Sequence, residues 1–398
     1  MKVLFFVRDL KAPSVTFIRN QVKLVSGYHE VMVITVDHMT EYEVDGITCL
    51  GIPYQDSYWT NRPLRRLAKW DWYYGFFNPL FGKRLRLVVE DFAPEVIHCQ
   101  FGPDGLLFLD HFPNEREIPV FIQFRGYDAS HMYTKKSYQK RLRWIFKKSW
   151  IHPIYVSHNQ YDRTVRLDIL PKKRRVLYSC TDTDFFSFKP RKYESTKSIF
   201  KFLQVGRMVE VKGHEFTLLA FHQLQSYLGK VGKSAMLTFV GGGELEKPIR
   251  QKCMELGLSD QVKFMESVSH KEVLRFLEET DFFLHPSLTT SDGRIEGLPN
   301  AIMEALAVGV PVIATKHSGM DELLCPDGAL FLVEEWNVAE YAETMIQLIE
   351  GNLKYDPLQS RRMIEEKFSA KQHISQLLGF YEEEATLSTS QIDAQLDL

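Results

Sequence analysis

Short runs of apolar residues alternate along this chain with longer stretches in which apolar positions recur every third or fourth residue. Because strands and helices have different periods, the pattern predicts strands that alternate with helices. The predicted strands are residues 3–7, 31–36, 95–101, 120–124, 151–157 and 176–179, and then 201–206, 236–241, 262–265, 281–285, 310–314 and 329–333. The clearest helices are residues 216–228, 247–256, 271–279, 338–349 and about 357–385. Such alternation is typical of parallel sheets, so we expect an α/β fold with two sheets.

The length of 398 residues exceeds what one hydrophobic core usually serves, which predicts two domains. The boundary is expected near residues 188–197, where Pro190 and several charges precede a fresh strand. We therefore expect an N-terminal domain over 1–190 and a C-terminal domain over 191–370. Residues 371–398 are expected to form a C-terminal helix that can cross back to the first domain, followed by a disordered polar tail beyond Thr386.

The composition, 44% hydrophobic and 25% charged, is typical of a globular protein in water. No apolar run approaches the roughly 20 residues that span a bilayer, and Arg8 and Asp9 end the first apolar run too early for a signal peptide. We therefore expect a cytoplasmic protein.

The five cysteines are far apart and form no CxxC pair, which argues against a disulfide framework or a zinc site.

The net charge of −2 hides an asymmetry between the two halves. Residues 1–190 carry 28 Lys and Arg against 20 Asp and Glu, and the remainder carries 21 against 31. Basic residues are interleaved with aromatic ones over 61–86 and 135–150, a composition that suits an anionic membrane surface. The alternative is an ordinary amphipathic helix with its aromatics in the core. No nucleic-acid motif accompanies these stretches. A lipid-linked acceptor at the inner face of a membrane would explain both.

The segment from Glu296 to Glu304 places two carboxylates eight residues apart. Gly297 and Pro299 suit the first positions of a helix, so we expect Glu296 at a helix start and Glu304 inside the helix, both on one face. A helix N-terminus favours phosphate, and a carboxylate beside it can accept hydrogen bonds from sugar hydroxyls. The alternative is a surface helix with an acidic first turn.

A second candidate is the loop after the predicted strand 201–206, which carries Arg207 and Lys212. Ligands of open α/β sheets gather outside the carboxyl ends of the strands, and two cations there can neutralise a diphosphate. The alternative is a pair of solvated loop cations.

A third candidate, Gly241–Gly243, also follows a strand. A GxGxxG motif would need glycine where Glu246 stands. The turn between the first predicted strand and the following helix, residues 8–14, contains no glycine either. Both observations disfavour a dinucleotide-dependent oxidoreductase. A GxxxxGK[ST] loop is absent as well. The three glycines would instead let the backbone approach a ligand or a neighbouring loop.

These segments together resemble the ordered signature of family 4 retaining glycosyltransferases. The match consists of Gly206-Arg207…Lys212-Gly213, the Gly241–Gly243 turn, Asp281…Pro286-Ser287, and Glu296-x7-Glu304. The first half is similar to the exopolysaccharide branch, through Ser14-Val-Thr16-Phe17, Ile97-His98…Gly102, Gly126-Tyr127-Asp128 and Asp182-Thr-Asp-Phe185. The resemblance covers about residues 1–370. It implies the GT-B fold, in which two Rossmann-like domains with parallel sheets face a central cleft.

The resemblance also implies roles for matched residues. Arg207 and Lys212 would bind the donor diphosphate, Glu296 the sugar hydroxyls and Glu304 the ribose. The other donor-binding candidates are Gly206, Gly242, Gly297, Leu298 and Asn300, and the acceptor-side candidates are Ser14, Thr16, His98 and Asp128. Retention in this family is described as front-face attack without a protein nucleophile, so charge stabilisation of the leaving diphosphate supplies most of the catalysis. No metal or cofactor is expected, and no DxD triad is placed to hold a metal.

Two positions depart from the family pattern. Arg125 stands where the family commonly has a histidine that faces the transferred sugar, and Cys180 stands where a glycine is usual. Arg125 is therefore a catalytic candidate whose role is open: it could bind an anionic donor or acceptor, or pair with Asp128. The histidines at 98, 158, 214 and 285 are, taken singly, more often structural than catalytic.

We therefore expect a retaining hexosyltransferase that moves a sugar from a UDP- or GDP-sugar to a glycan or lipid-linked glycan of a cell-surface polysaccharide. An alternative enzyme is a GT-B epimerase or hydrolase, which would need no acceptor. An alternative of another class is a non-catalytic scaffold that binds sugar nucleotides. The four charged residues Arg207, Lys212, Glu296 and Glu304 argue against lost activity, while Arg125 leaves the question open.

Overall fold

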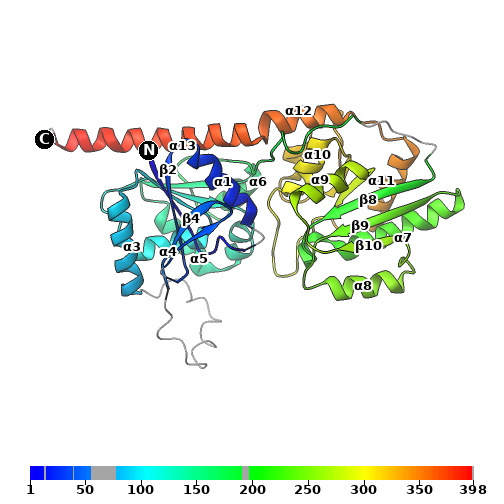
Figure 1. Cartoon of the computed structure of the whole chain (residues 1–398), viewed down its shortest axis with the longest axis horizontal. Coiled ribbons are helices and arrows are strands. Elements are labelled where there is room, and N and C mark those ends of the chain that lie inside the picture. Colours follow the sequence, from blue (N-terminus) through cyan, green and yellow to red (C-terminus); the bar gives the residue numbers. More distant parts are fainter. Residues whose placement is uncertain (13–14, 39, 55–77, 191–196, 397–398) are drawn as a thin grey trace, which may run out of the picture. The chain divides into compact units, whose positions relative to one another are not determined.

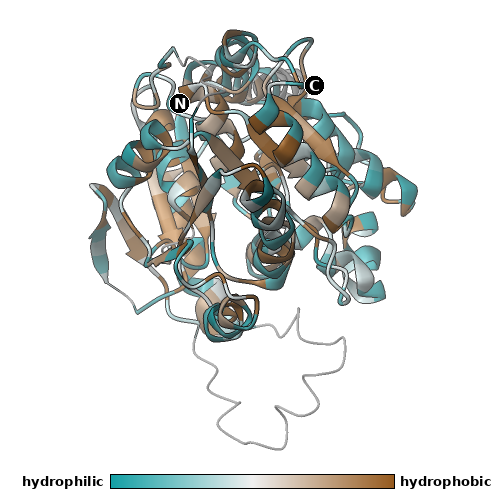
Figure 2. Cartoon of the chain, turned by 90° about the vertical axis from the view of Figure 1, so that its right-hand side faces the viewer, coloured by the Kyte–Doolittle hydropathy of each residue, from teal (hydrophilic) through white to brown (hydrophobic). Residues whose placement is uncertain are grey.

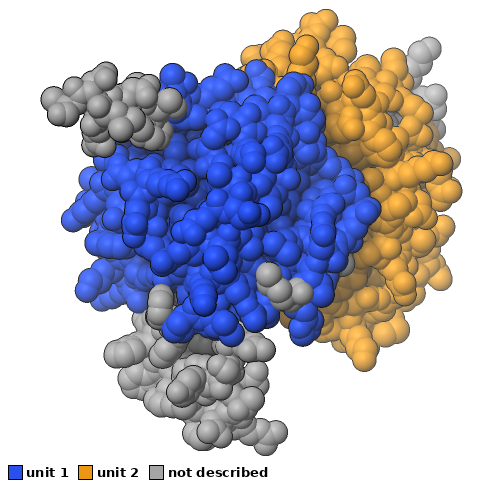
Figure 3. Space-filling view, turned by 60° about the vertical axis from the view of Figure 1, so that its left-hand side comes forward, with its two compact units in different colours: residues 1–178, 373–398 blue, residues 179–372 orange. Residues whose placement is uncertain are grey.

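The computed structural model describes residues 1–12, 15–38, 40–54, 78–190 and 197–396. The chain forms two compact units, one of residues 1–178 with 373–398 and the other of residues 179–372 (Figure 3). Hydrophobic colour is concentrated on the strands, and the helices alternate between hydrophobic and hydrophilic turns (Figure 2). No helix in the described ranges combines the length and the apolarity that a membrane span requires.

The first unit contains a seven-stranded sheet in the order β3-β4-β2-β1-β5-β6-β7. Its strands are β1 (Lys2–Val7), β2 (Glu30–Thr35), β3 (Glu41–Val44), β4 (Ile47–Gly51), β5 (Val96–Cys99), β6 (Val120–Phe124) and β7 (Ile151–Tyr155). All neighbours pair in parallel except β3 and β4, which form an antiparallel hairpin at one edge. The predicted strand 176–179 was wrong, because Val176 makes a single bridge to Tyr155.

Side chains of β1 alternate between two cores, one on each face of the sheet. Leu4 and Phe6 pack with the helices α3 (Pro79–Phe92), α4 (Gly102–His111) and α5 (Lys136–Ile145). Val3, Phe5 and Val7 pack with α1 (Thr16–Ser26) and α13 (Ala370–Leu396). A further helix, α6 (His158–Arg166), follows β7. Burial on both faces explains why these strands are continuous apolar runs.

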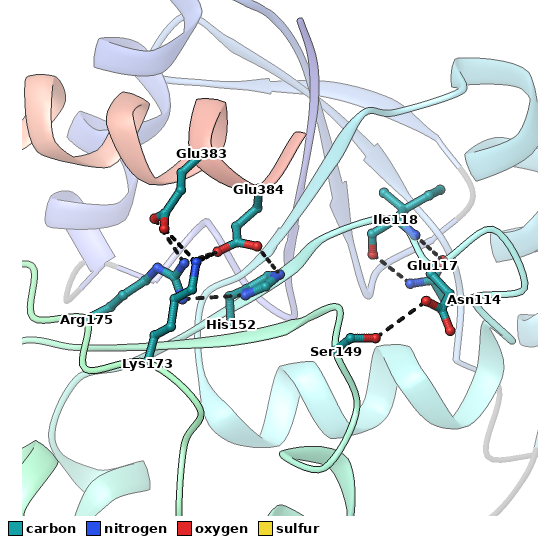
Figure 4. Close-up of polar contacts among 9 residues, drawn as sticks. All are labelled: Asn114, Glu117, Ile118, Ser149, His152, Lys173, Arg175, Glu383 and Glu384. Atoms are coloured by element: carbon teal, nitrogen blue, oxygen red, sulfur yellow. Dashed lines mark hydrogen bonds and ion pairs between the residues drawn. The ribbon is translucent and has the colours of Figure 1, made fainter. Parts of the chain in front are cut away.

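The C-terminal helix α13 belongs mainly to the first unit, and an ion-pair network attaches it there. Arg175 and Lys173 both reach Glu383 and Glu384, and His152 Nε2 lies 3.5 Å from Glu384 (Figure 4). The same close-up shows a separate set of contacts around Asn114, Glu117, Ile118 and Ser149. The helix extends to Leu396, past Thr386, where the polar tail was expected to begin (Figure 1).

The second unit contains a six-stranded parallel sheet in the order β10-β9-β8-β11-β12-β13. The strands are β8 (Ile199–Val205), β9 (Ser234–Val240), β10 (Val262–Met265), β11 (Phe282–His285), β12 (Val312–Thr315) and β13 (Leu330–Val333). The helices are α7 (His214–Lys230), α8 (Glu246–Glu255), α9 (His270–Glu279), α10 (Asn300–Val308), α11 (Val338–Glu350) and α12 (Pro357–Lys367). The strand order reverses between β8 and β11, and such a switch point is where α/β sheets bind ligands.

The chain passes from the first unit to the second at Tyr178, ahead of the expected boundary at residue 190. Thr181 pairs with Ser369, and the guanidinium of Arg361 donates to the backbone carbonyls of Thr183 and Phe186. These contacts attach residues before 190 to the second unit. Part of the expected linker, residues 191–196, lies outside the described residues.

Candidate functional site

The three glycines after β9 pack against the loop that follows β8. The backbone N–H of Met208 donates to the carbonyl of Gly242 at 2.9 Å. A Cβ on Gly241 would lie 2.4 Å from the carbonyl oxygen of Gly206, and a Cβ on Gly243 would lie 2.5 Å from that of Met208. Because Gly241 and Gly243 have no side chain, the loop after β8 can pack closely against them. A Cβ on Gly242 would meet nothing closer than 3.6 Å, so this glycine keeps open space beside it.

A second close approach joins the loop after β8 to the loop after β11. Gly213 has a left-handed backbone, with φ of 59°, and a Cβ there would lie 2.3 Å from the carbonyl oxygen of Pro286. The backbone N–H of Leu288 donates to the carbonyl of Val211 at 2.9 Å. These contacts bring Lys212 to the carboxyl end of β11, at the switch point of the sheet.

Lys212 and Glu296 form an ion pair at this switch point, and the side chain of each is 16% exposed. Ser287 donates its hydroxyl to the second carboxylate oxygen of Glu296 at 2.8 Å. The Nε2 atom of His285 lies 3.4 Å from both the ammonium of Lys212 and the carboxylate of Glu296. We refer to Lys212, His285, Ser287 and Glu296 as the donor cluster.

The charge states of the donor cluster follow from burial and from the ion pair. Burial alone would raise the pKa of Glu296, but the charge of Lys212 and the hydrogen bonds from His285 and Lys212 outweigh it and hold this pKa well below its usual range. Burial and the nearby Lys212 lower the pKa of His285. At neutral pH Glu296 is therefore an anion and His285 is uncharged.

The backbone of Glu296 is held as firmly as its side chain. Its N–H donates to Nε2 of His317 at 3.0 Å, and Nδ1 of His317 lies 2.7 Å from the carboxylate of Glu335. His317 follows β12 and Glu335 follows β13. Sequence reasoning missed both residues. Their position after two predicted strands was the available signal, since ligand sites gather at the carboxyl ends of parallel strands.

The helix α10 begins at Asn300, with Pro299 as its N-cap, so Glu296 lies in the preceding loop. The prediction that Glu296 and Glu304 share one helix face was therefore wrong. The reason is that Pro299 has an extended backbone. It therefore precedes the first turn of α10 as its N-cap and is not part of that turn. Within the described residues, the backbone N–H groups of Gly297 and Leu298 donate to no protein acceptor.

Glu304 lies in the second turn of α10 and is partly exposed. Burial raises the pKa of its carboxyl to about 7. No ion pair or hydrogen bond of this carboxyl is found among the described residues, in contrast to Glu296. Arg207 is exposed, and within the described ranges its guanidinium makes no ion pair and does not contact the donor cluster. Both groups are therefore available to a ligand.

The predicted residues of the first unit form a different arrangement. Nη2 of Arg125 donates to the side-chain oxygens of Gln21, Gln100 and Gln123 at 2.7–2.9 Å, and its guanidinium stacks on Phe17 at 4.5 Å. The guanidinium is thus engaged by three neutral amides. One alternative left open for Arg125 was an ion pair with Asp128. In these contacts the guanidinium binds the three amides, and only the backbone N–H of Arg125 reaches Asp128.

Asp128 instead accepts hydrogen bonds from backbone N–H groups, at 2.9 Å from both Gly102 and Arg125. His98 is fully buried, stacks on Phe5 and hydrogen-bonds to Tyr381. This burial removes His98 from direct contact with an acceptor, and it corrects the expectation of an acceptor-side role.

Two further acceptor-side candidates lie at the start of α1. Thr16 is the first residue of this helix. Ser14 lies outside the described residues, so its acceptor-side role stays a prediction. Across the described ranges, no group of three or more His, Cys, Asp or Glu side chains is arranged to hold a metal ion.

Comparison with known proteins places the donor cluster within a family domain. Residues 185–368 match the family described as glycosyl transferases group 1. The chain is 28% identical over 294 residues to the amylovoran biosynthesis glycosyltransferase AmsK of Erwinia amylovora, covering 72% of this chain and 69% of that protein. It is 25% identical to the putative colanic acid biosynthesis glycosyltransferase WcaL of Salmonella typhimurium, covering 90% and 93%.

Solved structures share the fold at lower identity. A sucrose-phosphate synthase from Thermosynechococcus elongatus has a TM-score of 0.74 at 15% identity, and covers 97% of this chain and 100% of its own. Anabaena HepE in complex with UDP has a TM-score of 0.73 at 16% identity, and covers 96% and 100%. The expected fold of two Rossmann-like domains with parallel sheets is thereby confirmed.

Proposed function

Because residues 185–368 match the family described as glycosyl transferases group 1, we propose that this chain moves a sugar from a UDP- or GDP-sugar to a glycan or lipid-linked glycan. The product would be a cell-surface polysaccharide. Two relatives named for amylovoran and colanic acid biosynthesis support this substrate class. A structural neighbour solved with UDP-glucose supports a nucleotide-sugar donor.

The donor cluster is the observation that carries the proposal. Its ammonium and carboxylate lie at the switch point of the second sheet, where a ligand of an α/β fold is expected. The diphosphate would share the charge of Lys212, and Glu296 would accept hydrogen bonds from sugar hydroxyls. The backbone N–H groups of Gly297 and Leu298, which have no acceptor in the described residues, would donate to the same ligand.

We further propose that transfer retains the configuration of the sugar and needs no metal ion. The cations Arg207 and Lys212 would stabilise the negative charge that develops on the leaving diphosphate, the task that a divalent metal performs elsewhere. An NMR measurement of the anomeric product and an assay in EDTA test these two statements. An inverted product, or activity that returns only when a divalent metal is added, would contradict them.

We also propose peripheral contact between the first unit and an anionic membrane. On α5 and the turn after it, Lys136, Lys140, Trp144 and Lys147 are exposed and follow one another at intervals of three or four residues. They therefore form one face, which we call the basic face. The buried residues of the same helix, Tyr138, Leu142 and Ile145, belong to the core, as the alternative interpretation expected. Residues 61–77 of the other basic and aromatic stretch, 61–86, lie outside the described residues.

Nucleotide binding tests the proposed site. We expect UDP or GDP to raise the melting temperature of the protein, because a ligand that binds the folded state stabilises it. Arg207→Ala and Lys212→Ala should each weaken nucleotide binding by about 1.5–3 kcal/mol. Lys230→Ala, which removes an exposed cation at the end of α7, is the matched control. Unchanged affinity in both test variants would mean that the site is misplaced.

A further inference from the structure

The loop between β11 and α10 is held at both ends by one carboxylate. Glu335 accepts the backbone N–H of Thr289 at 2.7 Å and its hydroxyl at 3.2 Å, which fixes the start of the loop. The same carboxylate lies 2.7 Å from Nδ1 of His317, whose Nε2 accepts the N–H of Glu296 at 3.0 Å. Glu335 therefore acts on the end of the loop through His317.

These contacts specify the protonation of His317. Because Nε2 accepts a peptide N–H, it must carry a lone pair, and the hydrogen of the neutral ring must be on Nδ1, where it donates to Glu335. A carboxylate that fixes an imidazole in one tautomer and orientation is a recurrent device in catalytic sites. The side chain of His317 is 0% exposed, so water cannot readily replace either bond.

The residues that directly follow His317 and Glu335 both have an unusual backbone conformation. Ser318 and Trp336, each directly after one member of the pair, have positive φ angles of 36° and 65°. Residues other than glycine pay a conformational cost in this region, and such conformations persist where the surroundings impose them, often at functional sites. Here they follow the two side chains that hold the loop.

We propose that His317 and Glu335 are a positioning pair for the donor, an inference that rests on the proposed function of the donor cluster. With the N–H of Glu296 committed to His317, the peptide plane before Glu296 has one orientation. The next two N–H groups, those of Gly297 and Leu298, are then left for the ligand. Without the acceptor at position 317 this peptide can rotate, and the N–H groups lose their common direction.

Two substitutions at His317 separate this role from simple packing. His317→Phe keeps a planar ring but removes the acceptor. His317→Gln supplies an amide oxygen that can accept from Glu296 and an amide nitrogen that can donate to Glu335. With UDP, GDP and UDP-glucose as probes, we expect the phenylalanine variant to lose about tenfold or more in affinity for the nucleotide that the parent binds. The glutamine variant should stay within about threefold of the parent.

Glu335→Ala provides an independent test. It leaves Nδ1 of His317 without its acceptor, so affinity should fall in the same direction as for His317→Phe. Because both residues act through the same peptide, Glu335→Ala should cost less in the His317→Phe background than in the parent. If His317→Phe does not fold, Glu335→Ala decides the matter, and unchanged affinity in that variant overturns the proposal.

The matched control removes a bond of the same kind elsewhere in the second unit. Ser360 accepts the backbone N–H of Ala329 at 2.8 Å, at the amino end of β13. Ser360→Ala should lower the melting temperature without changing nucleotide affinity. Parent-like affinity in His317→Phe, or a loss that glutamine does not restore, would overturn the positioning role. If Lys212→Ala also leaves affinity unchanged, the proposed donor site itself has failed.

Discussion

At the scale of single residues, the donor cluster is electrically balanced before any ligand binds. Lys212 and Glu296 neutralise each other, while Arg207 is exposed and makes no ion pair in the described residues. A diphosphate would therefore bring two negative charges to Lys212, which is already paired with Glu296, and to Arg207, which is exposed. The ion pair also keeps Glu296 ionised, so in the proposed role it would be able to accept hydrogen bonds from sugar hydroxyls over the whole physiological pH range.

Glu304 supplies a prediction on pH. Burial raises the pKa of its carboxyl to about 7, and ribose hydroxyls would donate to the ionised form. Binding therefore favours loss of the proton, and nucleotide affinity should fall as the pH drops from about 8 to about 6. Titration calorimetry at several pH values measures this. Glu304→Gln should bind more weakly and lose most of this pH dependence, and a Glu304→Gln variant with the parent profile would contradict the assignment.

The candidate residues on loops after strands could be found from the sequence, because a cation or carboxylate directly after a strand is a recognisable pattern. Arg207 and Lys212 were proposed in this way, and Glu296 was proposed from its place before a predicted helix. His317 and Glu335 also follow strands, but they were missed because their role, which is to hold a backbone N–H, is not visible in the sequence. His98 was over-interpreted, since its polar ring is buried and bonded to Tyr381.

At the scale of elements, the glycine turn after β9 gives a prediction with an internal control. Gly241→Ala would place a methyl group 2.4 Å from a backbone oxygen, at a φ of 125° that alanine disfavours. We expect a loss of about 2–4 kcal/mol in the free energy of unfolding. Gly242→Ala meets only the flexible tip of Glu246 at 3.6 Å and should leave stability nearly unchanged. Chemical denaturation measures both, and equal losses would refute this division.

Gly242→Ala also tests the predicted donor role of that glycine. A methyl group that fills the open space beside Gly242 should weaken nucleotide binding while the protein remains stable. Nucleotide affinity equal to that of the parent would remove Gly242 from the site.

The elements of the second unit were all predictable, because each strand is a short apolar run enclosed by helices. The hairpin of β3 and β4 was missed although its Asp45-Gly46 turn, with φ angles of 52° and 77°, is the strongest short hairpin signal. Residues 176–179 have a strand-like sequence but make a lone bridge. Local sequence cannot reveal that difference, because it depends on which partner strand the fold provides.

At the scale of the whole molecule, the charge asymmetry between the halves leads to a prediction on membranes. Each exposed cation near an anionic surface contributes about 1 kcal/mol. Replacing Lys136, Lys140 and Lys147 by Gln should therefore weaken binding to anionic vesicles about a hundredfold, and high salt should weaken the parent similarly. Co-sedimentation with neutral and anionic vesicles is the measurement.

The control for the basic face carries the same charge change on the second unit, in Lys230, Lys247 and Lys354, all of which are exposed. It should bind anionic vesicles as the parent does. Equal binding of the parent to neutral and anionic vesicles would exclude an electrostatic mechanism, and a water-soluble glycan would then be the better acceptor.

Turnover and nucleotide binding in Glu296→Gln test the central claim most directly. The carboxylate is proposed to contact the sugar and not the bare nucleotide. Release of UDP or GDP from the accepted nucleotide sugar should fall by about a hundredfold, as for loss of a charged hydrogen bond that strengthens in the transition state. Affinity for the bare nucleotide should stay within about threefold. Parent-like turnover, or a loss of nucleotide affinity as large as the loss of turnover, would contradict the account.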